Sequence, residues 1–204
     1  EDRRQRQMCK ETADIDSEKK LELQLSERAS YDFLSQLYNR STFERELKSE
    51  IERSAHAKVA VLFIDVDDFK FINDRFGHSV GDEVIKYVAG CIKQRVKGSG
   101  FAGRFGGDEF VLCITDPKQI EEIESLSLDL IDELYEGYHS ELANVSINVK
   151  ASIGIAFYPE HGDDSNKVVA AADEAMYFVK KNGKANYHIY QPEDSEMEDL
   201  QHTL

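Results

Sequence analysis

The sequence is short of cysteine and of long hydrophobic runs, and each shortage excludes a class of protein. The three cysteines, Cys9, Cys91 and Cys113, are an odd number at wide spacing. This excludes a disulfide framework and favours reduced, buried thiols in a cytoplasmic protein. No Cys/His cluster has the spacing of a zinc site. No apolar run reaches about 18 residues, so no segment is expected to span a membrane.

Basic residues are also scarce, which leaves a formal net charge of -15. Proteins that bind nucleic acid polymers carry a basic field, so a nucleic acid polymer is not expected as a partner. A small anionic ligand is compatible with this charge where local lysines or a metal ion offset it. The chain has 204 residues and starts at Glu1, so we expect a fragment of a longer protein that contains one domain.

The residue pattern predicts one domain at 31–190 with an extension on either side. Residues 1–30 are charged and carry a thin apolar stripe, which fits either a helical coiled-coil linker or a solvated helix. Residues 191–204 are acidic and poor in apolar residues, so we expect a disordered tail there.

Within the domain, segments of helical spacing alternate with apolar runs of strand length. Ser41 is the candidate N-cap of the second part of the first helical segment, with Glu44 as its capping-box partner. Two strands around the turn at 105–108 join the runs 59–65 and 145–159 in a mixed, largely antiparallel sheet. The predicted class is an α/β fold whose sheet is flanked by helices. Helices are expected over about 33–51, 67–77, 80–96, 118–138 and 165–182, and a last strand over 186–190.

Carboxylates lie at the ends of two predicted strands. Asp65 ends the apolar run "KVAVLFID", and Asp108 and Glu109 follow two glycines at the turn of "FAGRFGGDEFVLCI". If these strands are neighbours, the carboxylates converge, and their repulsion is relieved by a divalent cation. Magnesium suits such a site because it binds one or two carboxylates together with substrate phosphates. For Asp67 and Asp68, an ordinary polar strand end is the favoured interpretation.

Polar side chains in "FKFINDRFGHSVGDE" surround a predicted helix–loop–helix. Asn73 and Asp82 together offer a donor and acceptors, which suit the edge of guanine. Helix capping explains Asp82 equally well. Lys70 and His78 lie in the same stretch, and a histidine after a glycine is usually a loop residue.

Basic residues gather near the end of the domain in "VKKNGKANY". Lys180, Lys181 and Lys184 surround a glycine, and lysines at the end of a helix are stabilised by its dipole. The alternative interpretation is a phosphate clamp, which Arg104 joins from its place just before the two glycines.

Several of these segments resemble the GGDEF family, the diguanylate cyclases. "RFGGDEF" at 104–110 resembles its signature, and "FIDVDDFKFINDRFGHSVGDEVI" resembles its metal- and nucleotide-binding segment. "YDFLSQLYNRSTF", "ASIGIAFYP" and "ADEAMYFVKKNGKANY" resemble its opening and closing segments, in the right order over about 31–190. The resemblance implies a fold similar to the palm of polymerases and nucleotidyl cyclases.

The resemblance also implies an activity and its partners. Two GTP molecules are condensed into cyclic di-GMP, with release of two pyrophosphates, by a homodimer in bacterial second-messenger signalling. Mg²⁺ or Mn²⁺ is the implied cofactor, and an upstream sensor domain belongs to the full-length protein, which could be tethered to a membrane. The alternative is a catalytically silent module that binds GTP for regulation or dimerisation.

Individual roles follow from the same resemblance. It assigns metal binding to Asp65, the carbonyl of Val66, Asp108 and Glu109. Asp108 also deprotonates the attacking 3′-hydroxyl, and Glu109 supports it as the second catalytic acid. Together with Arg104 from the clamp considered above, the substrate-binding set is Lys70, Asn73, His78, Asp82, Arg104, Gly106, Gly107, Lys180 and Lys184.

The chain departs from the family at three places. Many members carry an inhibitory R-x-x-D site that starts nine residues before the first signature glycine. Here residues 97–100 read "KGSG", so cyclic di-GMP is not expected to bind there. Lys184 replaces a common arginine, which removes the bidentate fork and keeps the charge, and Ala185 replaces a frequent asparagine. Asp82 is retained, which favours guanine.

Overall fold

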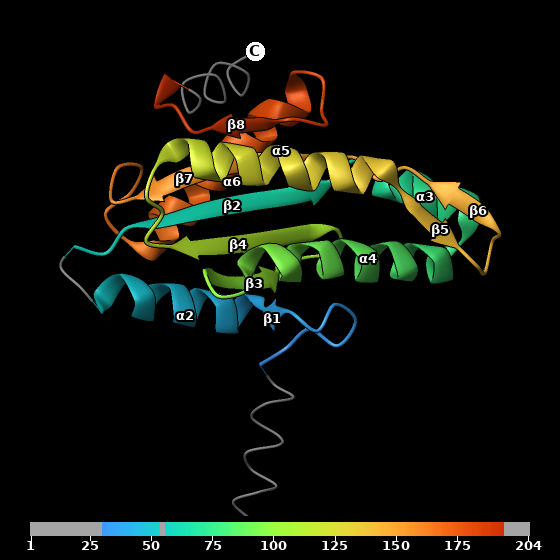
Figure 1. The fold of residues 1–204 in the computed structure, drawn as a ribbon, viewed down its shortest axis with the longest axis horizontal. Helices are drawn as coiled ribbons and strands as arrows, with labels where there is room; N and C mark the ends of the chain where they lie inside the picture. The colour runs from blue at the N-terminus through green and yellow to red at the C-terminus, as the bar shows by residue number, and fades with distance from the viewer. Residues whose placement is uncertain (1–29, 54–55, 194–204) are drawn as a thin grey trace, which may run out of the picture.

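A computed structural model describes residues 30–53 and 56–193. Within them, a six-stranded sheet has the order β1-β3-β4-β2-β7-β8, with antiparallel pairs in the centre and a parallel pair at each edge (Figure 1). The predicted mixed, largely antiparallel α/β fold is therefore confirmed. The strands are β1 (Tyr38–Asn39), β2 (Val59–Val66), β3 (Gly100–Arg104), β4 (Glu109–Thr115), β7 (Ala151–Tyr158) and β8 (Tyr187–Ile189).

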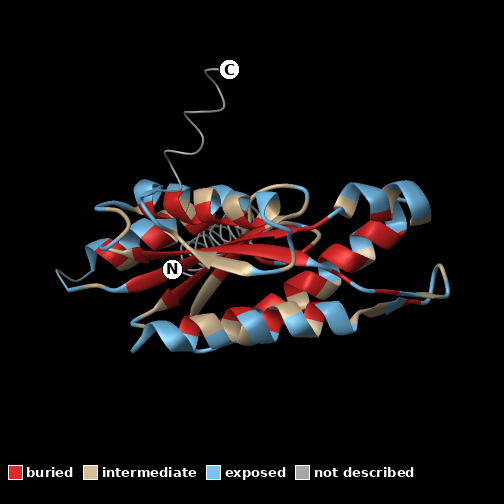
Figure 2. Ribbon diagram, turned by 90° about the horizontal axis from the view of Figure 1, so that it is seen from above, coloured by how far each residue is buried: buried red, intermediate tan, exposed pale blue. Residues whose placement is uncertain are grey.

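Helices cover both faces of this sheet, as the buried layer between two rows of helices shows (Figure 2). Alternate residues of β2 point to opposite faces, so this strand, which is covered on both sides, is buried throughout and is apolar apart from Asp65. Its even-numbered residues pack against α4 and α5, and its odd-numbered residues pack against α2 and α6. The helices are α2 (Arg40–Glu52), α3 (Phe69–Phe76), α4 (His78–Val96), α5 (Ile120–Glu136) and α6 (Ser165–Lys181).

The first helix begins later than predicted, and its cap is a different residue. The side chain of Asn39 accepts a hydrogen bond from the backbone N–H of Thr42 at 3.0 Å, so Asn39 is the N-cap of α2. The predicted capping box of Ser41 and Glu44 is therefore wrong. Both residues lie inside the helix, where Glu44 forms an ion pair with Arg40. Asparagine caps as well as serine does, and here it comes two residues earlier.

The predicted long strand over 145–159 is two strands. β6 (Val145–Ile147) pairs with β5 (Tyr138–Ser140) in a separate two-stranded sheet, and β7 belongs to the main sheet. Between them, Val149 donates its backbone N–H to the carbonyl of Leu134 at 3.1 Å, and Asn148 donates its side-chain amide to Tyr135. The alternation of apolar and polar residues continues across this break, which is why the sequence predicted a single strand. Alternation alone does not reveal which strand a residue pairs with.

Other predictions concern the cysteines, membrane-spanning segments and the two ends of the chain. Cys91 and Cys113 are buried free thiols, as predicted. Among the described residues, none of the helices combines the length and apolarity that crossing a bilayer requires. Cys9, residues 1–29 of the predicted linker and residues 194–204 of the predicted tail lie outside the described part of the chain, so the predictions for these segments stay predictions.

Candidate functional site

Two strand ends bring the predicted carboxylates together. Asp65 is directly opposite Glu109 in the antiparallel pair of β2 and β4. Directly opposite residues project from the same face of a sheet, so these two side chains are neighbours. The backbone N–H of Val66 donates to the carbonyl of Asp108 at 3.1 Å, which places the hairpin turn beside the end of β2. The condition of the prediction, that the end of β2 lies beside the hairpin that carries the two acids, is confirmed.

Asp65 is the buried member of this acidic group, with 5% of its surface exposed. Its pKa is raised to about 6, because burial and, to a smaller extent, the carboxylates of Asp108 and Glu109 outweigh the opposing effect of Lys180. The ammonium of Lys180 lies 2.6 Å from Oδ1 of Asp65. One cation therefore already neutralises part of the negative charge at this point.

The acidic group fits a divalent cation that substrate phosphates help to bind. Oδ1 of Asp65 is buried and lies 2.6 Å from the ammonium of Lys180, so a metal ion bound at this carboxylate would compete with that lysine. Within residues 30–53 and 56–193, no three His, Cys, Asp or Glu side chains are gathered into a cage for a metal ion. The predicted ligands Asp65, Asp108, Glu109 and the carbonyl of Val66 would therefore need phosphate oxygens to complete a site, which is how Mg²⁺ is commonly bound.

The hairpin turn is closed by its own backbone and braced by Arg104. Phe105 donates its N–H to the carbonyl of Glu109 at 2.9 Å, Gly106 lies against the carboxylate of Glu109, and Gly107 faces open space. Arg104 donates to the carbonyl of Gly107 at 2.6 Å and forms a 3.0 Å ion pair with Asp32. The guanidinium of Arg104 therefore holds the turn. Its predicted contact with a substrate phosphate stays a prediction.

Asp32 is a residue that sequence reasoning did not single out. It lies in the turn before β1, where its carboxylate accepts hydrogen bonds from the backbone of Ser35 and from Arg104. The available signal was the segment "YDFLSQLYNRSTF", which resembles the opening of the family pattern. The pairing itself joins residues 72 positions apart, and no local pattern reports it.

The residues predicted to bind guanine lie in α3 and α4, which follow β2 in the chain at the end of that strand where Asp65 lies (Figure 1). A Cβ atom on Gly81 would lie 2.0 Å from Oδ1 of Asn73, so the two helices meet closely at this amide. Asp82 lies inside α4, which begins at His78, and the capping interpretation of Asp82 is therefore wrong. Lys70, His78 and Asp82 are exposed, and their substrate-binding roles stay predictions.

Two of the three clustered lysines reach the acidic end of β2. Lys180 pairs with Asp65, and Lys184 lies 2.7 Å from Asp68. Lys181 lies instead over the ring of Tyr177, at 4.3 Å from its centroid. The helix dipole alone does not account for two lysines that both meet carboxylates at or just after the end of β2.

Asp67 is also buried but differs from Asp65 in its contacts. It accepts hydrogen bonds from the hydroxyl of Ser152 at 2.8 Å and from the backbone N–H of Ala185 at 3.0 Å. The polar strand-end interpretation does not describe this side chain, since it is 4% exposed.

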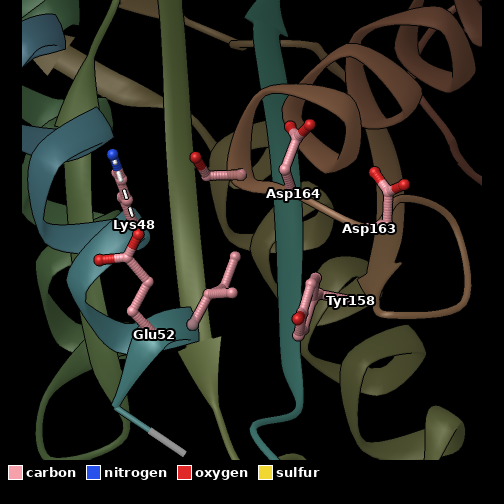
Figure 3. Close-up of a pocket in the computed structure, with 7 residues that line it drawn as sticks. Lys48, Glu52, Tyr158, Asp163 and Asp164 are labelled. Carbon is pink, nitrogen blue, oxygen red and sulfur yellow. Dashed lines mark ion pairs between the residues drawn. The ribbon is translucent and has the colours of Figure 1, made fainter. Parts of the chain in front are cut away.

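A hollow of about 450 Å³ lies at the opposite end of the sheet, near the start of β2 and the end of β7 (Figure 3). Its charged groups have partners within the protein. Asp164 caps α6, Asp163 forms an ion pair with Lys167 at 2.7 Å, and Lys48 lies 3.8 Å from Glu52. The hollow therefore contributes nothing to the acidic site.

Comparison with known sequences gives the same family as the motifs. Residues 29–186 match the family model described as "Diguanylate cyclase, GGDEF domain". The chain is 33% identical over 186 residues to signaling protein YkoW of Bacillus subtilis and 34% identical over 178 residues to diguanylate cyclase TpbB of Pseudomonas aeruginosa. It is 30% identical over 180 residues to cyclic di-GMP phosphodiesterase PdeR of Escherichia coli. These matches cover 90%, 83% and 88% of the chain but only 23%, 39% and 27% of the relatives.

Solved structures resemble the described fold closely. The coiled coil and GGDEF domain of DgcB from Caulobacter crescentus, in complex with c-di-GMP, matches with a TM-score of 0.84 at 25% identity. That match covers 90% of this chain and 97% of the DgcB chain. The isolated GGDEF domain of TpbB from Pseudomonas aeruginosa matches with a TM-score of 0.79 at 30% identity, over 83% of this chain and 99% of the other.

Proposed function

The chain belongs to the GGDEF-domain family of diguanylate cyclases, and we propose on this basis that it condenses two GTP molecules into cyclic di-GMP and releases two pyrophosphates. One observation carries the proposal: Asp65 lies opposite Glu109 and beside the turn of Asp108, while Lys180 reaches the same point. Acids and a lysine in one place suit a triphosphate bound with a divalent cation.

The acids have separate tasks in this proposal. Asp65, Asp108, Glu109 and the carbonyl of Val66 would hold Mg²⁺ or Mn²⁺, which neutralises phosphate charge and makes the attacking hydroxyl more acidic. Asp108 accepts the proton of the 3′-hydroxyl, since its turn presents it at the edge of the site. Glu109 supports the site from the first residue of β4.

The basic and polar residues position the nucleotide. Lys70, Lys180 and Lys184 contact the phosphates, and Arg104 supports the turn that lies against them. Asn73 and Asp82 bind the guanine edge from α3 and α4, with His78 in the same pocket. Gly106 and Gly107 allow the backbone to approach the nucleotide. Positioning and charge stabilisation supply most of the catalysis in such a site.

The reaction requires two copies of the domain. Each copy holds one GTP, and the 3′-hydroxyl of one GTP must lie in line with the α-phosphate of the other. We therefore propose a homodimer whose assembly is controlled by the segment before residue 30 and by a sensor domain upstream of it.

Feedback by the product at the inhibitory site of other family members is proposed to be absent here. Lys97 and Gly100 occupy the Arg and Asp positions of that site. A Cβ atom on Gly100 would lie 1.8 Å from the backbone carbonyl oxygen of Cys113, so β3 has no room for an aspartate there.

The direct test is to incubate the purified chain, at a series of concentrations, with GTP and Mg²⁺ or Mn²⁺. We expect cyclic di-GMP and pyrophosphate in a ratio of one to two, with a rate that rises faster than linearly with protein concentration. Asp108→Asn is the matched control and is expected to abolish both products. Absence of cyclic di-GMP from the chain at concentrations where it is dimeric would contradict the proposal.

A silent GTP-binding module is the second candidate. Two observations favour it: the relative PdeR is named as a phosphodiesterase, and Lys184 and Ala185 depart from the common residues. Tight GTP binding by a dimeric chain, with no pyrophosphate release under either metal, would decide for this alternative.

A further inference from the structure

We infer that Asp67 is a positioning residue, which holds the loop that carries Lys184 against the site. The inference rests on the proposed function, because it takes Lys184 as a phosphate contact. It assigns a task to a buried carboxylate that lies one residue beyond β2 and is not a metal ligand in the proposed mechanism.

Both carboxylate oxygens of Asp67 are already used inside the protein. Oδ1 accepts from the hydroxyl of Ser152 on β7 at 2.8 Å, and Oδ2 accepts from the backbone N–H of Ala185 at 3.0 Å. The backbone N–H of Asp67 donates to the carbonyl of Lys150 at 2.8 Å. The side chain is therefore turned towards β7 and the loop after α6, and it joins these two segments.

The loop that Asp67 holds has an unusual backbone. Gly183, Lys184 and Ala185 have φ values of +117°, +62° and +49°. Left-handed conformations are unfavourable for lysine and alanine, so such residues persist only where neighbouring structure imposes them. The N–H of Lys184 donates to the carbonyl of Val179 at 3.0 Å, and the carbonyl of Asn186 accepts from Ile153 at 2.9 Å. The bond from Ala185 to Asp67 lies between these two anchors.

The ion pair of Lys184 cannot hold the loop by itself. The side chains of Lys184 and Asp68 are 40% and 62% exposed, and exposed pairs contribute little to stability. Asp67 is buried, and a hydrogen bond from an N–H group to a buried carboxylate is strong. The direction of the Lys184 side chain therefore depends on Asp67, a residue that does not touch the substrate.

The test compares Asp67→Ala with Lys184→Met and with the double variant, in the full chain. We expect Asp67→Ala to raise the KM for GTP about tenfold, as loss of one charge-assisted contact does, with a smaller change in kcat. In the Lys184→Met background, Asp67→Ala is expected to raise KM no further, because the contact that it positions is gone. If the increases in KM caused by the two single substitutions multiply in the double variant, the two residues act independently and the inference is overturned.

Ser152→Ala is the matched control, since it removes the other hydrogen bond of Asp67 and leaves the loop bond in place. We expect it to lower stability without changing KM, and an equal rise in KM would overturn the inference. Asp67→Asn is the conservative variant if Asp67→Ala does not fold. Its amide oxygen still accepts from Ala185 while the hydroxyl of Ser152 turns to accept, so a KM close to that of the wild type is expected, and a rise of about tenfold would contradict us.

A readout without turnover separates this inference from the proposed function. Amide hydrogen exchange at Ala185 should accelerate in Asp67→Ala and remain slow in Ser152→Ala. Affinity for GTP, measured by equilibrium binding, should fall in Asp67→Ala and stay unchanged in Ser152→Ala. A chain that binds GTP but makes no cyclic di-GMP would refute the proposed function and leave this test intact. Unchanged exchange at Ala185 in Asp67→Ala would refute the inference alone.

Discussion

The ammonium of Lys180 lies 2.6 Å from Oδ1 of Asp65, so the last turn of α6 supplies a cation to the end of β2. The carboxyl of Asp65 still has a pKa of about 6, because burial and the neighbouring acids outweigh this lysine. The two residues are 115 positions apart in sequence, and the contact joins the proposed metal ligand to a proposed phosphate contact.

We expect Lys180→Met to increase the affinity of the nucleotide-free protein for Mn²⁺ by roughly fivefold, because the ion no longer competes with an ammonium for Asp65. A Mn²⁺ titration followed by electron paramagnetic resonance measures this directly. Lys184→Met is the control, since Lys184 pairs with the exposed Asp68. The Mn²⁺ affinity of this variant should equal that of the wild type. Unchanged or weaker Mn²⁺ binding in Lys180→Met would contradict the expectation.

Asp65→Asn should stabilise the metal-free protein at pH 7.5. The pKa of Asp65 is about 6 in the folded protein, and its ordinary value is 3.8. Between these two pH values, the folded protein therefore keeps a proton that the unfolded chain has lost. The stabilisation from this carboxyl is complete below about pH 4 and disappears as the pH rises through about 6. Removing the charge should then add on the order of 1–3 kcal/mol at pH 7.5 and little at pH 4.

Urea unfolding of wild type and Asp65→Asn at the two pH values measures this difference, with chelator present. The charge of Asp65 would then be an example of a functional group that lowers stability. A loss of stability at pH 7.5, or a difference that does not depend on pH, would show that the ionised carboxylate is not disfavoured in the fold.

Rebuilding the inhibitory site should fail at Gly100. The Cβ atom of an aspartate there would lie 1.8 Å from the carbonyl oxygen of Cys113, so β3 and β4 must separate. We expect Gly100→Asp to lower the free energy of unfolding by roughly 2–4 kcal/mol. Lys97→Arg, at an exposed position, is expected to be neutral. Calorimetric titration with cyclic di-GMP should detect no new binding in the double variant, and tight binding there would refute the prediction.

Gly81→Ala should damage recognition of guanine while the fold is kept. The new methyl group would lie 2.0 Å from Oδ1 of Asn73 and must displace that amide. We expect the KM for GTP to rise about tenfold and discrimination against ATP to fall, as for any lost hydrogen bond to a substrate.

Gly90→Ala is the matched control for this change. It lies in the same helix, its Cβ atom meets nothing within 4 Å, and it should stabilise α4 by up to about 1 kcal/mol without altering KM. Equal kinetics for the two variants would show that Asn73 does not contact the base.

The sequence by itself determined the class of the fold and most of the site. β2 is recognisable because burial on both faces requires an unbroken apolar run, and helical spacing marks α3 to α6 in the same way. The acids at 65, 108 and 109 were predicted to converge on the condition that their strands are neighbours, and they are. These features can be recognised in the sequence, because each of them depends on a run of consecutive residues.

Tertiary structure decided what depends on contacts between distant segments. Asn39 rather than Ser41 caps α2, the run after 145 divides between two sheets, and Arg104 pairs with Asp32. Asp65 and Asp67 look equivalent in sequence, since both are carboxylates at the end of one strand. Only packing separates them: Asp65 meets a lysine and two acids, while both oxygens of Asp67 bind neutral donors in β7 and the loop after α6. The role of a buried carboxylate is set by the groups that surround it, and those groups come from other parts of the chain.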